Sequence, residues 1–327
     1  MTLTRREMLR QALGYAAVVA VPGPLSACAG EPRDDALDAR GDSLPEVAAG
    51  GDFPPPGPGD LERLRSWIST LRAESLVDTS GTPGAAAARV GELAAGTPYE
   101  PYTLEEYLRA GGSPMRTEPL TLHLDRFDCV SLVEACLAIA RVARTPGEPR
   151  WEDFAREMER MRYRGGDRGG YTSRLHYFSE WLSDGEDRGL VQVLGEEFGG
   201  RADTRPLRFM SANPESYPAL STPEVLEEIR EIERGLDDSP RWVIPTARID
   251  SVSERIETGD VLAFATSIDG LDVTHAAFAY RDGEGVMRVL HAPLSGGVVE
   301  ITRATVQEYV GAIRLATGIL VARPLQG

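Results

Sequence analysis

The most informative absence in this 327-residue chain is lysine, because all 35 basic residues are arginines. Without lysine there is no P-loop nucleotide site, no Schiff base with substrate or pyridoxal phosphate, and no Ser-Lys hydrolase. Three cysteines are too few for a disulfide framework. The net charge of −16 disfavours binding to phosphate backbones, so no nucleic-acid partner is expected.

A long hydrophobic run is also lacking. The apolar stretch from Ala12 to Val21 is too short for a membrane span, which takes about 20 residues. Two arginines at positions 5 and 6 precede the stretch, and Leu25-Ser26-Ala27-Cys28 follows it, as in an export signal. The second motif resembles the lipobox of bacterial lipoproteins. It implies a signal peptide over residues 1–27 and a membrane anchor through a lipid on Cys28.

The export route and the destination are less sharply defined. Residues 4–9 resemble the twin-arginine signal, and the choice between that route and general secretion stays open. Because Ala29 is not Asp, we expect a periplasm-facing lipoprotein in the outer membrane.

Residues 28–59 are rich in proline, glycine and acidic side chains, which predicts a tether with no core of its own. The tether contains Gly41-Asp42-Ser43-Leu44, a match to the GDSL esterase signature. We reject an esterase because this serine does not follow a buried strand. Residues 60–327 are expected to form one large domain.

The periodicity of that domain predicts helices first and an antiparallel sheet afterwards, the α+β class. Asp60 is expected to cap one helix, and Thr103 with Glu106 forms a capping box for a second. Further helices are expected from Cys129, over Trp151 to Met161 and over Pro223 to Leu236. The expected strands are Leu120 to Leu124, Trp242 to Ile249, Asp260 to Thr266, Thr274 to Tyr280, Val286 to His291 and Gly318 to Arg323, with a hairpin turn at Asp282-Gly283.

Cys129 stands at the start of the most apolar predicted helix. Free N–H groups at a helix N-terminus favour a thiolate, so we expect a lowered pKa and a nucleophilic Cys129. The same N–H groups could hold an oxyanion. Cys136 lies seven residues further along the apolar helix, and we interpret it as a core residue.

Four histidines are present, at positions 123, 176, 275 and 291. His275 begins one strand of the predicted hairpin and His291 ends the other, so the two should meet at its open end. They could be a general base and its orienting partner, or two structural hydrogen-bonding residues. Zinc on Cys129, His275 and His291 would block the nucleophile, and no HExxH or CxxC motif is present, so neither metal nor cofactor is expected.

The motifs Phe127 to Glu134, Gly259 to Leu262, Thr274 to Phe278 and Leu290 to Ala292 together resemble the NlpC/P60 papain-like hydrolases. More narrowly, Gly170 to Trp181 and Gly270 to His275 resemble the DUF1460 branch, which is N-acetylmuramoyl-L-alanine amidase-like. The resemblance implies a papain-like fold, with the catalytic Cys at the start of a core helix packed on an antiparallel sheet and with added helices. It also implies Cys129 as nucleophile, His275 as base and His291 as the orienting residue.

The segment around Tyr171 carries groups suited to a sugar and a carboxylated peptide. Tyr171, Arg174, His176 and Tyr177 are candidate substrate-binding residues, with Asp272 as a further candidate. The alternative is a helix whose aromatic residues pack inward and whose arginine forms an ion pair. For Asp272, a turn-capping role is equally compatible with the sequence.

The resemblance therefore predicts a cell-wall cysteine amidase that cleaves the N-acetylmuramoyl-L-alanine bond of peptidoglycan fragments (muropeptides), with anhydro forms included. Two alternatives stay open. One is an NlpC/P60 endopeptidase that cuts between D-glutamate and the diamino acid, and the other is a non-catalytic wall-binding lipoprotein.

Overall fold

The structure is a computed structural model that describes residues 53–77, 82–237, 239–294 and 297–326. The predicted signal peptide, Cys28 and the tether up to residue 52 lie outside the described residues. Within the described ranges, no helix combines the length and the hydrophobicity needed to cross a membrane.

In the described part of the chain, eight strands form one antiparallel sheet in the order β2-β3-β8-β4-β5-β6-β7, with β1 also paired to β8. The strands are β1 (Val191–Val193), β2 (Arg201–Asp203), β3 (Arg241–Pro245), β4 (Val261–Thr266), β5 (Val273–Arg281), β6 (Met287–His291), β7 (Glu300–Ile301) and β8 (Ala316–Pro324). The central strand β4 is buried along its whole length. This arrangement confirms the predicted α+β class with an antiparallel sheet.

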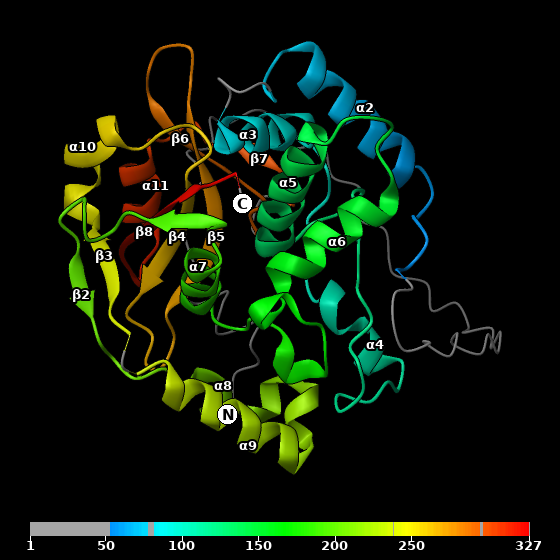
Figure 1. The fold of residues 1–327 in the computed structure, drawn as a ribbon. Coiled ribbons are helices and arrows are strands. Elements are labelled where there is room, and N and C mark those ends of the chain that lie inside the picture. The colour runs from blue at the N-terminus through cyan, green and yellow to red at the C-terminus, as the bar shows by residue number, and fades with distance from the viewer. Residues whose placement is uncertain (1–52, 78–81, 238, 295–296, 327) are drawn as a thin grey trace, which may run out of the picture.

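Helices cover both faces of this sheet (Figure 1). They are α2 (Asp60–Ala73), α3 (Pro83–Leu93), α4 (Glu106–Arg109), α5 (Cys129–Arg144), α6 (Trp151–Arg162), α7 (Phe178–Asp187), α8 (Phe209–Ala212), α9 (Pro223–Gly235), α10 (Ile249–Val252) and α11 (Val306–Ala312). The main core joins α2, α3, α5 and α6 to one sheet face, while α10 and α11 close a second core on the other face.

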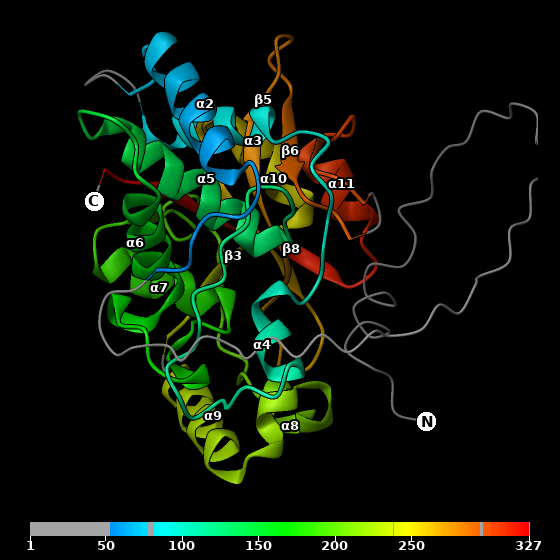
Figure 2. The same ribbon diagram turned by 90° about the vertical axis from the view of Figure 1, so that its right-hand side faces the viewer.

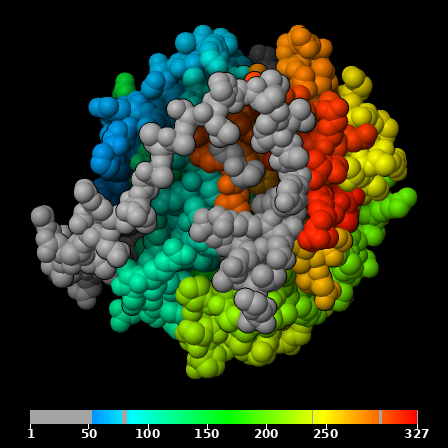
Figure 3. Space-filling model, turned by 180° about the vertical axis from the view of Figure 1, so that it is seen from behind, coloured from blue at the N-terminus to red at the C-terminus, as the bar shows by residue number. Residues whose placement is uncertain are grey.

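A third hydrophobic cluster lies apart from these two cores. It joins Tyr171 and Tyr177 to α8, α9 and the residues between them. Figures 1 and 2 place α8 and α9 together at one end of the molecule. Seen from behind, the residues near α4 adjoin that same end, teal beside light green in Figure 3. This end supplies much of the wall of the cavity described below.

The start of α5 is fixed by its sequence. Asp128 is the N-cap and its Oδ1 accepts the Ser131 N–H at 2.7 Å, while the Ser131 hydroxyl accepts the Asp128 N–H at 2.9 Å. This reciprocal capping box satisfies two N–H groups at the helix start. It makes Cys129 the first residue of the helix, as the sequence predicted.

Four local predictions differ from the structure. The strand expected over Trp242 to Ile249 ends at Pro245, because residues 246–248 form a 3-10 turn and Ile249 begins α10. Asp60 is the first residue of α2 and does not cap it, since Gly59 occupies the N-cap with φ of 79°. Thr103 begins a short 3-10 turn before α4 and makes no capping hydrogen bond. Residues 120–124 alternate in burial but form no strand, because the Thr121 carbonyl accepts a bond from the Arg162 side chain at 2.6 Å rather than from a neighbouring strand.

Candidate active site

A cavity of about 230 Å³ lies where the start of α5, the start of β5 and the α8–α9 end of the molecule meet. Cys129, His275 and Ala276 line one side of it. Tyr102, Phe209 and Tyr217 line it from the other elements. A cavity with one apolar and aromatic wall and a few convergent polar groups is the usual form of a small-molecule site.

The β5–β6 hairpin brings the two predicted histidines together. The register pairs Phe278 with Leu290, so His275 and His291 point to the same face of the sheet. His275 Nε2 lies 2.8 Å from His291 Nδ1. Both side chains are buried, and His291 has no exposed surface.

Aromatic rings hold the two imidazoles in place. Phe264 on β4 packs against His275 with 5.3 Å between ring centroids, and Tyr309 on α11 meets the His291 ring edge-on at 5.0 Å. Because Nε2 of His275 contacts His291, Nδ1 is the ring nitrogen left for another partner, and Cys129 lines the same cavity.

The Cys129 sulfur lies among backbone N–H groups, and the residue is partly buried in the cavity wall. Burial, and to a smaller extent the Asp128 carboxylate, raise the pKa of the thiol to about 12. The N–H groups of Ala276, Val130 and Cys129 itself oppose this shift. The sequence-based expectation of a lowered pKa is therefore wrong for this structure, because desolvation outweighs the helix terminus.

The pKa of His275 is shifted as well. Burial lowers it well below the usual 6.5, and the neighbouring His291 lowers it further. A raised thiol pKa and a lowered imidazole pKa mean that the pair rests as a neutral thiol and a neutral imidazole. Any attack by this sulfur would require the thiol proton to move first.

Arg174 lines the cavity but is not a free cation. Its guanidinium is buried, with Nε 3.2 Å from Glu118 Oε1 and Nη2 3.8 Å from Glu105 Oε1. These two protein carboxylates balance the positive charge of Arg174, which the sequence analysis had proposed as a partner for a substrate carboxylate.

Of the three neighbouring aromatic candidates, two line the cavity and one packs behind its wall. His176 and Tyr177 line the cavity, whereas Tyr171 is fully buried and lies outside the lining. Tyr171 packs against the His176 ring at 4.4 Å and its carbonyl contacts His176 Nε2 at 2.8 Å. Tyr177 donates its hydroxyl to Glu233 Oε1 at 2.7 Å, which ties the wall to α9. A direct substrate contact by Tyr171 is thus a prediction that its placement contradicts.

Asp272 also lines the cavity, but its carboxylate serves the backbone. Oδ2 accepts the Ser179 N–H in the first turn of α7, and Oδ1 accepts the Val273 N–H, each at 2.7 Å. Of the two roles considered for this residue, capping is the one its hydrogen bonds support.

The sequence reading missed the buried charges that form the floor of the cavity. Arg162 Nη2 lies 2.8 Å from Glu134 Oε2, both side chains are about 2% exposed, and both line the cavity. Tyr107 and Tyr163 surround Glu118 and each approaches it at 3.4 Å. The sequence does contain one signal for these charges. Glu134 occupies a position in α5 where the apolar pattern of the helix calls for a buried residue.

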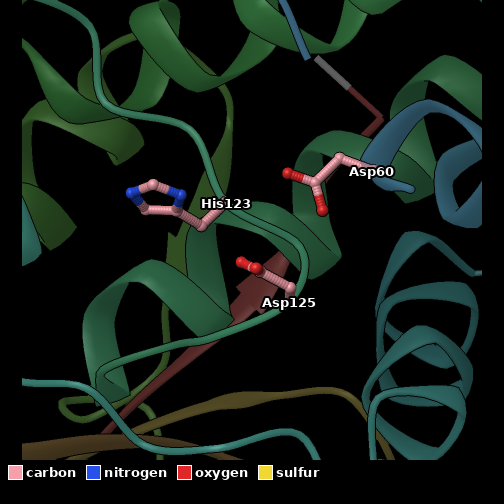
Figure 4. Close-up of side chains that lie close together, drawn as sticks. All are labelled: Asp60, His123 and Asp125. Atoms are coloured by element: carbon pink, nitrogen blue, oxygen red, sulfur yellow. The ribbon is translucent and has the colours of Figure 1, made fainter. Parts of the chain in front are cut away.

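One group of side chains in the described residues has the spacing of a metal site, and it lies outside the cavity. Ligand atoms of Asp60, His123 and Asp125 fall within 4.8 Å of one another (Figure 4). Arg63 pairs with Asp60 at 3.1 Å, and Arg126 contacts both Asp125 and His123, each at 3.1 Å. Two guanidinium groups already supply the positive charge there, so we interpret the cluster as an ion-pair network.

Comparison with known proteins assigns the chain to a family. The model of the N-acetylmuramoyl-L-alanine amidase-like (AmiA-like) family matches residues 89–319. The chain belongs to this family. None of the curated proteins compared with the chain shows significant similarity to it.

Solved structures agree with this assignment. An N-acetylmuramoyl-L-alanine amidase from Bacteroides uniformis is 28% identical with a TM-score of 0.67, over 74% of this chain and 98% of that one. A Bacteroides fragilis protein, named provisionally as a xylanase, is 31% identical with a TM-score of 0.65, over 71% of this chain and 98% of that one. A Legionella pneumophila protein described as DUF1460 shares the fold at 18% identity, with a TM-score of 0.57 over 81% and 94% of the two chains. The chain is thus a member of an amidase-like family related to cell-wall amidases.

Proposed function

We propose that this protein is a cysteine amidase of the NlpC/P60 papain-like type that hydrolyses the bond between N-acetylmuramic acid and L-alanine in muropeptides. The observation that carries the proposal is the 2.8 Å contact between His275 Nε2 and His291 Nδ1, in a cavity that also contains Cys129 at the capped start of α5. A nucleophile, a base and an orienting group for that base are the minimum set for acyl transfer through a thiol.

The proposed reaction starts from a neutral Cys129 thiol and a neutral His275 imidazole. His275 Nδ1 takes the thiol proton as the Cys129 sulfur attacks the lactyl carbonyl carbon. The carbon–nitrogen bond then breaks, and the same proton goes to the leaving amine of L-alanine. Water, deprotonated by His275, hydrolyses the thioester, which restores the thiol and releases the muramic acid carboxylate.

Backbone N–H groups near the sulfur are suited to the oxyanion. The capping box occupies the Ser131 N–H, which leaves those of Cys129 and Val130 at the start of α5, and the Ala276 N–H approaches the sulfur from β5. Fixed donors of this kind stabilise the tetrahedral intermediate without reorganisation.

The small volume of the cavity, about 230 Å³, supports a small fragment as substrate rather than an intact wall polymer. The carboxylates in its lining do not favour the glycosidase chemistry suggested by the name of the Bacteroides fragilis relative. Asp272 accepts the Ser179 N–H and Asp128 caps α5, while Glu134 is paired with Arg162 and Glu105 with Arg174. None is therefore set as a general acid opposite a second free carboxylate.

Mass spectrometry of the purified protein with a defined anhydro-muropeptide, and separately with whole sacculi, tests this function. We expect the free muramic sugar and a peptide that begins with L-alanine. Cys129→Ser should abolish product, while Cys136→Ser, the matched control on the same helix, should retain it. A sugar that keeps L-Ala-D-Glu, with release of a peptide that begins with the diamino acid, would show the endopeptidase instead. No product from either substrate would contradict the proposed amidase.

We also propose that the protein is exported, anchored in the outer membrane by a lipid on Cys28 and exposed to the periplasm. The motif Leu25 to Cys28 and the preceding apolar run support this. Labelling of cells with a fatty acid analogue should mark the wild-type protein but not Cys28→Ala, and Cys129→Ala should remain labelled. Equal labelling of the wild type and Cys28→Ala would contradict the anchor.

A further inference from the structure

Of the two ring nitrogens of His291, only Nδ1 takes part in the proposed mechanism. Nδ1 contacts His275, but Nε2 is buried and has no hydrogen-bond partner among the described residues. An unpartnered polar atom in a side chain without exposed surface is costly, and its surroundings are informative.

The charged group that faces this atom is Glu300. Its Oε1 lies 3.8 Å from His291 Nε2, and the two residues are direct cross-strand partners in the β6–β7 register. The contact is thus set by strand pairing, while the Glu300 side chain stays 46% exposed. His275 from β5 and the edge of the Tyr309 ring from α11 are the other titratable groups packed against His291.

The mechanism dictates where the protons on both imidazoles must be. His275 Nδ1 can take the thiol proton only if it is unprotonated, so Nε2 carries the hydrogen and donates it to His291 Nδ1. His291 Nδ1 must then be an acceptor, and its own hydrogen must sit on Nε2, which points to Glu300. In a neutral imidazole one nitrogen donates and the other accepts, so a single acceptor at this end selects the tautomer of both rings.

We propose that Glu300 is a positioning residue that holds the Nε2–H tautomer of His291, and through it the reactive tautomer of His275. The proposal rests on the proposed function for its catalytic consequence, but not for the tautomer itself. A movement of the half-exposed side chain by less than 1 Å, or a bridging water, brings the 3.8 Å approach to hydrogen-bond length. As His275 becomes positively charged in the reaction, the carboxylate also stabilises that charge through His291.

Nitrogen-15 NMR of the histidine rings reads the tautomers directly, and four histidines keep the spectrum simple. We expect His291 as the Nε2–H form in the wild type and a mixture of both forms in Glu300→Ala, with His123 and His176 unchanged. Glu300→Gln keeps an acceptor oxygen without the charge and should keep most of the Nε2–H form. Glu284→Ala, an exposed glutamate in the hairpin turn, is the matched control and should leave all four rings unchanged.

Turnover gives the second readout. With the anhydro-muropeptide, Glu300→Ala should lower kcat about tenfold with KM nearly unchanged, and Glu300→Gln should lie between it and the wild type. An unchanged His291 tautomer in folded Glu300→Ala would overturn the proposal, even if the wild type is an active amidase. A wild type without hydrolysis but with the expected tautomer shift would overturn the amidase function and leave the role of Glu300 supported.

Discussion

The buried ion pair on the cavity floor gives the sharpest test of how this protein is stabilised. Arg162 Nε and Nη2 both lie 2.8 Å from Glu134 Oε2, and both side chains are about 2% exposed. Substituting Arg162→Met leaves a buried carboxylate without its partner, and Glu134→Leu leaves a buried guanidinium. Removing one partner of such a pair costs about 3–5 kcal/mol of unfolding free energy.

The double variant Glu134→Leu/Arg162→Met should be much more stable than the sum of the singles implies. It removes both charges and loses mainly the 2.6 Å bond from Arg162 to the Thr121 carbonyl, a cost of about 1–3 kcal/mol. Urea unfolding of the wild type, both singles and the double variant gives the coupling energy. A double variant destabilised by the full sum, or singles that each cost under about 1 kcal/mol, would refute the reasoning.

Three further outcomes are expected. Cys129→Ser should abolish hydrolysis with little change in stability, whereas Cys136→Ser buries a hydroxyl, costs about 1–3 kcal/mol in urea unfolding and keeps activity. His275 has a folded pKa below 6.5, so its contribution to stability is complete above that pH and is lost as the pH falls toward the folded pKa. The unfolding free energy of His275→Gln, measured between pH 7.5 and pH 5, should therefore fall less than that of the wild type, and parallel curves would contradict the shift. Asp272→Ala removes the acceptor for the Ser179 N–H and should lower the melting temperature, with a cost of about 1 kcal/mol, while Asp272→Asn should cost less.

The sequence predicted the elements whose signals are local. The Asp282-Gly283 turn between two β-rich runs indicated the β5–β6 hairpin, and the apolar periodicity that begins at Cys129 indicated the start of α5. Both depend on residues within a few positions of one another. The proximity of His275 and His291 then followed from hairpin geometry.

Features that depend on distant residues were not predictable in this way. Arg174 meets Glu118, and Arg162 meets Glu134, across separations that no local pattern encodes. The pKa of Cys129 was mispredicted for the same reason, since the helix terminus is visible in the sequence but the burial that dominates it arises from tertiary packing.

The separate hydrophobic cluster under α8 and α9 has a consequence for how new specificities can arise. The imidazole pair is held by the sheet and its flanking cores, whereas much of the opposite cavity wall belongs to the cluster around Tyr177, Phe209 and Tyr217. Substitutions between residues 205 and 236 can therefore reshape the cavity while the proposed catalytic groups keep their support. One part of the chain can thus vary to change which ligands fit, while another part keeps the proposed reaction unchanged. Selection can act on ligand range without disturbing that reaction.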